Sequence, residues 1–242
     1  MSQNLIPGGH GRRTIYNYVK EYLTPDKIFD KITQRDWPYK RNVDFYVTRD
    51  NALCCVAYMS SGRINEIVKR LKRSHFVEKS QYIKTSDPDA MFISNFWVSK
   101  RWPGGMRRRR IPILDENDKI VSYKIIEEYR PPTRNPIIEI PLPRVGVLGQ
   151  YTEKIEEYLE LLHQDQVLFP FTTSRAWSII RYKTDEFPHW LREQSLNYMV
   201  NTIRGGPFAV KKLRGIEDIR TLMHYYRGDQ ESATEDLKRS EI

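Results

Sequence analysis

The sequence lacks the features that mark several broad classes of protein. It has only two cysteines in 242 residues, and Cys54 and Cys55 are adjacent, which is not the pattern of a disulfide framework or a zinc site. We expect them to be small core residues in a reducing compartment. The longest strictly apolar run, residues 52–59, is far shorter than the roughly 20 residues that cross a bilayer. Residues 1–13 contain no apolar signal region, so a cytoplasmic location is expected.

Residues typical of several catalytic chemistries are also missing. The five histidines show no metal-ligand spacing, and no cysteine accompanies them. The sequence contains neither a glycine-rich loop of the P-loop type nor a serine nucleophile elbow. We therefore predict no metal and no cofactor.

Positive charge, by contrast, is in excess: 40 Lys+Arg against 31 Asp+Glu give a net charge of +9. The tail, residues 229–242, holds five acids and two bases, so residues 1–228 carry +12. This charge favours a polyanion as partner. Lysines and arginines gather in two clusters. The first consists of Lys69, Arg70, Lys72 and Arg73, and the second consists of Lys100, Arg101, Arg107, Arg108, Arg109 and Arg110. Trp97, Trp102 and the Pro-Gly-Gly turn favour phosphate-backbone contact by the second cluster, although a solvated loop is the alternative interpretation.

Composition divides the chain into three parts. Residues 1–40 are predicted to form a helical arm and linker, with helices over about 13–23 and, from the Thr24-Pro25 start signal, over about 25–32. Residues 41–228 form the main domain, and residues 229–242 form the acidic tail.

Within the main domain, hydrophobic patterns predict mostly helices. A buried helix carries residues 52–59, and the spacing of Ile64, Ile67, Val68 and Leu71 predicts an amphipathic helix. Residues 90–98 and 109–114 are predicted to pair as a hairpin, with a further strand near 137–140. Helices are then expected from Thr152, over about 174–182, from Pro188, from Pro207 and over about 217–227. The predicted fold class is mainly α with a small antiparallel β-sheet.

An ordered set of residues points to a specific chemistry. Arg63 follows Ser60-Ser61-Gly62, Lys100 falls at the basic hairpin, His189 precedes Arg192 by three residues, and two tyrosines end the last predicted helix. In this order and separation, residues 41–228 resemble the catalytic domain of the tyrosine recombinases, the phage-type integrases and their archaeal relatives.

Four segments carry the resemblance. Residues 61–66, Ser-Gly-Arg-Ile-Asn-Glu, resemble the family's T-G-x-R-x-x-E segment, and Lys100 falls where the family keeps a lysine in a β-hairpin turn. His189 and Arg192 resemble its H-x-x-R motif. Residues 214–218, followed by Thr221 and Tyr225, resemble its L-G-H/W segment and nucleophile.

The resemblance implies a role for each residue. Arg63 and Arg192 would clamp the non-bridging oxygens of a scissile phosphate, because guanidinium groups donate in pairs. His189 would accept a proton or donate a hydrogen bond, and Lys100 would protonate the leaving 5′ oxygen. Glu66 would orient the site. The structural alternatives are a helix-start cation for Arg63, a surface ion pair with Glu193 for Arg192, a cap or core residue for His189 and a DNA-backbone contact for Lys100.

Two tyrosines compete for the role of nucleophile. On a helix over residues 217–227, Ile219, Leu222, Met223 and Tyr226 share one apolar face. Tyr225 is rotated about 100° from that face and would be free to meet a substrate. The family register, counted from Gly215, also favours Tyr225, and Tyr226 is the alternative.

The sequence departs from the family pattern at two places. Ile216 stands where the family usually has a His or Trp that donates a hydrogen bond to the phosphate, so a weakened site is expected. In place of the family's N-terminal DNA-clamping domain there is only the arm, residues 1–40.

The resemblance implies a DNA recombinase or integrase that acts through a 3′-phosphotyrosyl intermediate without metal or ATP. Its partners would be double-stranded DNA and other copies of the chain, in a tetramer on two DNA sites with contacts by the tail. It would act at the nucleoid of a bacterial or archaeal cell, or in a virus-infected cell. A type IB topoisomerase-like activity and a non-catalytic DNA-binding protein on a recombinase scaffold are the alternatives.

Overall fold

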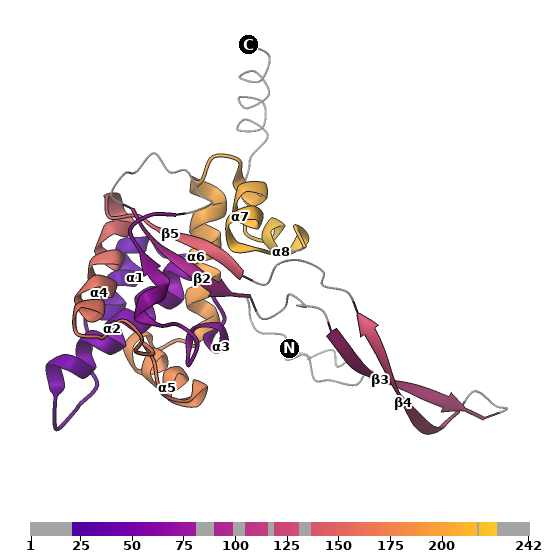
Figure 1. The fold of residues 1–242 in the computed structure, drawn as a ribbon. Helices are drawn as coiled ribbons and strands as arrows, with labels where there is room; N and C mark the ends of the chain where they lie inside the picture. The colour runs from indigo at the N-terminus through magenta and orange to yellow at the C-terminus, as the bar shows by residue number, and fades with distance from the viewer. Residues whose placement is uncertain are drawn as a thin grey trace, which may run out of the picture.

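The computed structural model describes residues 21–80, 90–98, 105–115, 119–130, 137–216 and 218–226. These residues form a helical body with a small sheet and a long β-hairpin that stands apart from it (Figure 1). The predicted fold class, mainly α with small antiparallel sheets, is confirmed. None of the helices described is both long and apolar enough to span a membrane.

Helix α2 (Val43–Ser60) is the centre of the body, as its apolar run predicts. Every residue of α2 from Ala52 to Ser60 is buried. Helices α4 (Gly149–Glu160), α5 (Thr173–Thr184) and α6 (Pro188–Thr202) all pack against it. The ring of Tyr58 stacks on that of Tyr151 from α4, with centroids 4.6 Å apart. A helix buried all round needs such a shell of neighbours.

Helix α1 (Pro25–Thr33) begins at the proline that the sequence predicts and packs into the same core. Its Ile28 and Ile32 are fully buried. The ammonium of Lys183, on α5, donates to the carbonyls of Ile32 at 3.1 Å and Arg35 at 2.9 Å. The helix predicted over residues 13–23 is not continued at residues 21–23, which are not helical, and residues 13–20 lie outside the described ranges. The domain division at residue 40 stays a prediction.

The small sheet has the strand order β1-β2-β5, from β1 (Phe76–Val77), β2 (Met91–Trp97) and β5 (Ile137–Leu142). All neighbours are antiparallel, and Ile93 of β2 pairs with Ile140 of β5. Strands β2 and β5 were both expected from the sequence, but their pairing with each other was not. The predicted pairing of residues 90–98 with 109–114 is wrong, because β2 lies between β1 and β5.

Residues 109–114 instead belong to β3 (Gly105–Leu114), which pairs along its length with β4 (Ile120–Arg130). Hydrogen bonds between Asp115 and Lys119 hold the ends of the connecting turn together. Either hairpin would close only a short loop, so loop entropy does not choose between them, but β4 offers a partner along the whole length of β3. The sheet of the body is left to β2 and β5, whose Ile93, Phe96, Ile140 and Leu142 are buried.

Three predicted helices differ from the structure in their ends. Helix α3 (Ile64–Ile67) is one turn, because Val68 is extended with ψ 137° and Lys69 then adopts a left-handed conformation with φ 63°, although Val68 and Leu71 remain buried as predicted. Helix α4 starts at Gly149, and the Thr152 hydroxyl donates to the carbonyl of Pro143 instead of capping. Helix α7 (Gly206–Arg214) is close to expectation, whereas α8 (Arg220–Met223) is much shorter than residues 217–227.

Candidate active site

The site begins where α2 ends. Ser61 caps α2 in a left-handed conformation with φ 48°, and the next residue, Gly62, touches the small sheet. A Cβ on Gly62 would lie 2.5 Å from Cζ of Phe96 and 2.9 Å from Oγ of Ser60. The glycine therefore allows close contact between backbone and Phe96, and this contact fixes where Arg63 leaves the α2 terminus.

Arg63 is held by Glu66, one turn further along α3. The carboxylate of Glu66 accepts from the Arg63 backbone N–H at 2.7 Å and from its Nη1 at 3.0 Å. The Glu66 side chain is 2% exposed, whereas that of Arg63 is 28% exposed. Arg63 is therefore a positioned guanidinium whose remaining donors are accessible.

Arg192 approaches the same point from α6. It is buried, and its Nη1 donates to the Ser61 carbonyl at the C-terminal end of α2. A cation is favoured there because the end of a helix carries partial negative charge. Burial, together with the nearby charge of Arg63, lowers the pKa of Arg192 to about 10, so the group stays protonated at neutral pH. The hydroxyls of Ser61 and Ser195, 2.8 Å apart, join α2 and α6 beside it.

These elements surround a cleft of about 200 Å³. Its walls come from the α2 terminus, α3, β2, α6, the end of α7 and the segment before α8. They consist of Ser60, Ser61, Gly62, Arg63, Glu66, Phe96, Val98, Arg192, Arg214, Gly215, Ile216, Asp218 and Thr221. Three arginines thus line the cleft with two carboxylates, which pair with Arg63 and with Arg220. The cleft is suited to an anion.

The two candidate tyrosines are exposed in the opposite order to the prediction. Tyr225 is 8% exposed in a small apolar cluster, and Tyr226 is 36% exposed. The predicted faces are wrong because α8 ends at Met223, so the 100° rotation per residue does not extend to either tyrosine. Tyr225 packs edge-on against Tyr22, with centroids 6.5 Å apart. It is also near enough to Arg192 to raise the pKa of that guanidinium, against the effect of burial.

His189 does not line the cleft. Its side chain is 53% exposed, and its Nε2 lies 3.3 Å from a carboxylate oxygen of Glu193, one turn further along α6. Burial raises the pKa of Glu193. In this arrangement α6 presents Arg192 to the cleft and His189 to the surface.

The two basic clusters differ in how their charges are paired. Lys69, Arg70 and Lys72 are exposed beside α3, and the Arg70 guanidinium lies 5.1 Å from the centre of the Trp97 ring. Nε of Arg73 donates to the Leu159 carbonyl at 3.1 Å. The first cluster therefore keeps three exposed cations in the segment that follows α3.

In the second cluster, acids of β4 lie opposite two of the arginines of β3. Arg108 pairs with Glu127 at 2.7 Å, and Arg107 lies opposite Glu128 in the register. Arg109 and Arg110 lie opposite Ile126 and Ile125. Lys100 and Arg101 lie outside the described residues, as do the Arg107 side chain and the tail.

The sequence did not single out Arg214 as a site residue. It belongs to the segment that resembles the L-G-H/W motif, but an arginine at the end of a helix usually complements the helix dipole. In the described part of the chain, no group of three or more metal-ligating side chains occurs. Burial also raises the pKa of the Cys54 thiol to about 12, which makes it unreactive.

No protein-family model matches the chain, and no curated protein does. Solved structures of tyrosine recombinases are similar to it. One is the XerH site-specific recombinase bound to difH substrate, at 14% identity and a TM-score of 0.47, covering 94% of this chain and 57% of the XerH chain. Another is the Tn1549 transposon integrase in complex with transposon right end DNA, at 14% identity and a TM-score of 0.45, covering 94% of this chain and 68% of the integrase.

The chain thus spans less than two thirds of the length of the XerH chain. At this identity the likeness is distant, and the chemistry of the cleft follows from its own geometry.

Proposed function

We propose that this chain cuts and rejoins DNA strands, as a site-specific recombinase or integrase of the tyrosine recombinase type. The observation that supports this most is the convergence of Arg63 and Arg192 at one cleft, with Tyr225 buried in the apolar cluster that includes Ile216 of the cleft wall. These residues come from three separate parts of the chain. A structural ion pair would need a carboxylate for each arginine, and the cleft has a surplus of cations instead.

Both arginines are oriented before any substrate arrives. Glu66 holds Arg63, and the Ser61 carbonyl holds Arg192. Each guanidinium has donors left for a non-bridging oxygen of a phosphodiester. Donors that need no reorganisation stabilise the extra charge of a pentacovalent transition state, an effect worth roughly 10²- to 10³-fold in rate per donor in other enzymes.

The proposed reaction exchanges one phosphoester for another. The Tyr225 hydroxyl oxygen attacks phosphorus and loses its proton, a phosphorus–oxygen bond to the tyrosine forms, and the bond to the 5′ oxygen breaks. The 5′ oxygen takes up a proton, for which Lys100 is the proposed donor. His189 is the proposed acceptor of the tyrosine proton or a hydrogen-bond donor, and because it faces the surface here, it would have to turn toward the cleft when DNA binds. The reverse attack by a 5′ hydroxyl rejoins the strand, so neither ATP nor a metal is required.

The burial of Tyr225 sets a condition on this proposal. Its ring packs with Leu196, Met199 and Ile216 in the apolar cluster, so binding of DNA must shift residues 218–226 toward the cleft. That segment is suited to movement because α8 has only four residues. Asn201, which donates to the Tyr225 carbonyl at 2.8 Å, would release it.

The proposed partner is double-stranded DNA, bound along its backbone by the exposed cations of both clusters. Lys69, Arg70 and Lys72 are exposed in the segment after α3, and Arg109 and Arg110 are exposed on the hairpin. Strand exchange between two sites would need four copies of the chain, and the tail, residues 229–242, is the proposed contact between them. The reaction would take place in the cytoplasm, at the DNA.

A non-catalytic DNA-binding protein is the second candidate. The buried Tyr225 and the absence of a hydrogen-bond donor at Ile216 favour it. Such a protein would keep the cationic cleft and bind a backbone phosphate without attacking it.

Capture of the covalent intermediate separates these candidates. The substrates are nicked duplexes of randomised sequence. Cleavage next to the nick releases a short strand that diffuses away, so the strand cannot be rejoined and the covalent adduct is trapped. The sequences of the trapped duplexes also identify the cleavage site. The wild-type chain and Tyr226→Phe should form an adduct that resists denaturing electrophoresis, and Tyr225→Phe should form none. DNA binding without any adduct would support the second candidate. Relaxation of a supercoiled plasmid by the monomer, without preference for a site, would indicate a topoisomerase instead.

A further inference from the structure

Arg214 is a cation with two buried guanidinium nitrogens whose hydrogen-bonding capacity is unused. It is the last residue of α7, before Gly215 turns the chain with φ 62°. Its Nε and Nη1 atoms are buried and have no hydrogen-bond partner. Its Nη2 lies 3.1 Å from the sulfur of Met199. The residue as a whole is half-buried, so its accessible area belongs to other atoms than these two nitrogens.

This arrangement is unfavourable for the protein by itself. A thioether is a weak acceptor, whereas a guanidinium has five strong donors and keeps its charge. Buried charges are normally paired with a carboxylate or fully hydrogen-bonded. In the described ranges no carboxylate forms an ion pair with Arg214, and burial together with the charge of Arg192 lowers its pKa to about 10.

The position of Arg214 indicates what kind of ligand would supply its missing hydrogen-bond acceptors. It lines the same cleft as Arg63 and Arg192, next to Gly215 and Ile216. Its other side faces an apolar cavity of about 360 Å³, whose walls include Met199 and Leu213. The guanidinium thus lies between a largely apolar cavity, where it contacts the Met199 sulfur, and a cleft that is open to an anion.

We propose that Arg214 is a third phosphate ligand and a catalytic residue of this chain, which exchanges its Met199 contact for a non-bridging oxygen of the scissile phosphodiester. This inference rests on the proposed function. Arg214 would supply the hydrogen bond that Ile216 cannot donate, from two residues earlier in the chain. Charge-assisted bonds to phosphate are roughly twice as strong as neutral ones, so the exchange favours the bound state.

Binding of inorganic phosphate tests this inference without any need for DNA cleavage. Thermal unfolding is measured in excess phosphate and in sodium chloride of equal ionic strength, for wild type, Arg214→Met and Lys212→Met. Lys212 is an exposed cation on the same helix and controls for net charge. Phosphate should raise the melting temperature of wild type and Lys212→Met, and Arg214→Met should lose most of that rise. An equal rise in Arg214→Met, or none in wild type, would overturn the inference.

The folding of the variant is checked by the same data. Because the substitution removes a buried charge without a carboxylate partner, Arg214→Met should melt at the same or a higher temperature than wild type in chloride. Arg214→Lys keeps the charge but not the paired donors, so its phosphate response should be intermediate.

Adduct formation under single-turnover conditions then tests the catalytic role. Arg214→Met should be slower than wild type by roughly 10²- to 10³-fold, the usual cost of removing one such donor, and Lys212→Met should be unchanged. With a methylphosphonate linkage, in which a methyl group replaces one charged oxygen, the difference between Arg214→Met and wild type should narrow strongly.

The two proposals fail in different ways. If wild type forms the adduct and Arg214→Met forms it equally fast, the role of Arg214 is refuted and the proposed function stands. If wild type forms no adduct, the proposed function fails, and the phosphate experiment still decides whether Arg214 binds the anion.

Discussion

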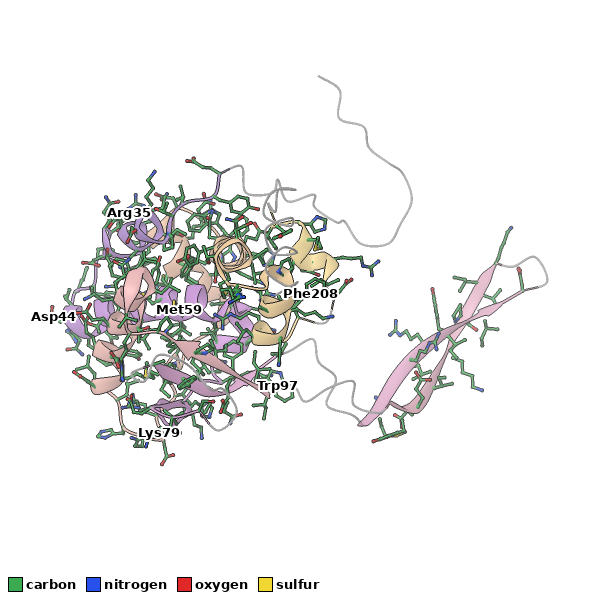
Figure 2. The ribbon with its side chains drawn as sticks, turned by 90° about the horizontal axis from the view of Figure 1, so that it is seen from above. Arg35, Asp44, Met59, Lys79, Trp97 and Phe208 are labelled. Carbon is green, nitrogen blue, oxygen red and sulfur yellow. The ribbon has the colours of Figure 1, made fainter. Side chains whose placement is uncertain are left out.

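The helical body and the β3–β4 hairpin place their side chains in opposite ways. In the body, apolar residues such as Leu53 and Ile179 are fully buried, and Arg192 and Glu66 are buried and held by hydrogen bonds. In the hairpin, Tyr123 and Ile125 are 56% and 58% exposed. Figure 1 and Figure 2 both show the hairpin apart from the body, which contains Met59.

The difference separates two tasks. The body has a core, and that core fixes the arginines of the cleft. The hairpin has cross-strand pairs and no core of its own among the described residues, so its contribution must come from what its surface binds. Substitutions in the two regions should therefore have different effects on stability and on DNA binding.

The largest difference is expected for loss of an apolar side chain. Leu53→Ala should lower the free energy of unfolding by about 2–5 kcal/mol, because it leaves a cavity around a fully buried position. Ile125→Ala, in the hairpin, should change it by less than about 0.5 kcal/mol. Unfolding in guanidinium chloride measures both. Equal losses would show that the hairpin folds as part of the body.

A smaller loss of stability is expected when a methyl group is added at a position of the body that has no space for it. Gly62→Ala places a Cβ 2.5 Å from the ring of Phe96, and the repacking should cost about 1–3 kcal/mol. Because Gly62 precedes Arg63, adduct formation should also slow. A variant that keeps both its stability and its rate would contradict the role given to this glycine.

The pH dependence of stability should come from the body. Burial raises the pKa of Cys54 to about 12, and that of Cys55 is also raised. The unfolded thiols ionise near pH 9 while the folded ones stay protonated, so the unfolded state binds fewer protons. The contribution of the two thiols to the free energy of unfolding is then constant below this pH, and above it falls by about 1.4 kcal/mol per pH unit for each thiol.

Denaturant unfolding between about pH 8 and pH 10 checks this slope, because the range spans the thiol pKa and ends where Arg192 and Arg214 begin to lose their protons in the folded state. A Cys54→Ala, Cys55→Ala double variant should be less stable at neutral pH and should lose stability more gradually as pH rises. The same slope in wild type and variant would show that other groups control alkaline unfolding.

Substitution of the hairpin arginines should have the smallest effect on stability. It should instead weaken the binding of DNA. Arg109→Ala with Arg110→Ala should leave the melting temperature unchanged. It should reduce the slope of log affinity against log salt by about 0.9 for each DNA phosphate that the variant no longer neutralises. Arg108→Ala is the matched control, because Arg108 already pairs with Glu127 and should change the slope much less. If Arg108→Ala reduced the slope as much as each arginine of the double variant does, paired and unpaired positions would not differ in DNA binding.

The sequence predicted the elements of the body well, because their signals are local. The apolar run of α2, and Pro25 and Pro188 at the starts of α1 and α6, act within one helix. Strand pairing depends on which segments meet. The alternation in residues 90–98 and 109–114 is compatible with pairing to each other and equally with pairing to other strands. The structure resolves that ambiguity by giving β3 a neighbour of matching length in β4.

The cleft was predictable only in part. Arg63, Glu66, Arg192 and Ile216, all named from sequence, line the cleft, whereas His189 does not. A spacing of three residues places two side chains on neighbouring sides of a helix, and it does not decide which of them the adjacent elements bury. Arg214 had no signal of its own, because its distinguishing property is the lack of hydrogen-bond partners for two of its nitrogens in three dimensions.

The tyrosines give the most direct test, because accessibility favours Tyr226 whereas the position beside Arg192 favours Tyr225. The covalent adduct can be digested with nuclease and trypsin, and fragmentation of the peptide that carries residues 221–227 locates the phosphate on one tyrosine. Our account predicts a nucleotide remnant on Tyr225. A remnant on Tyr226 would contradict it.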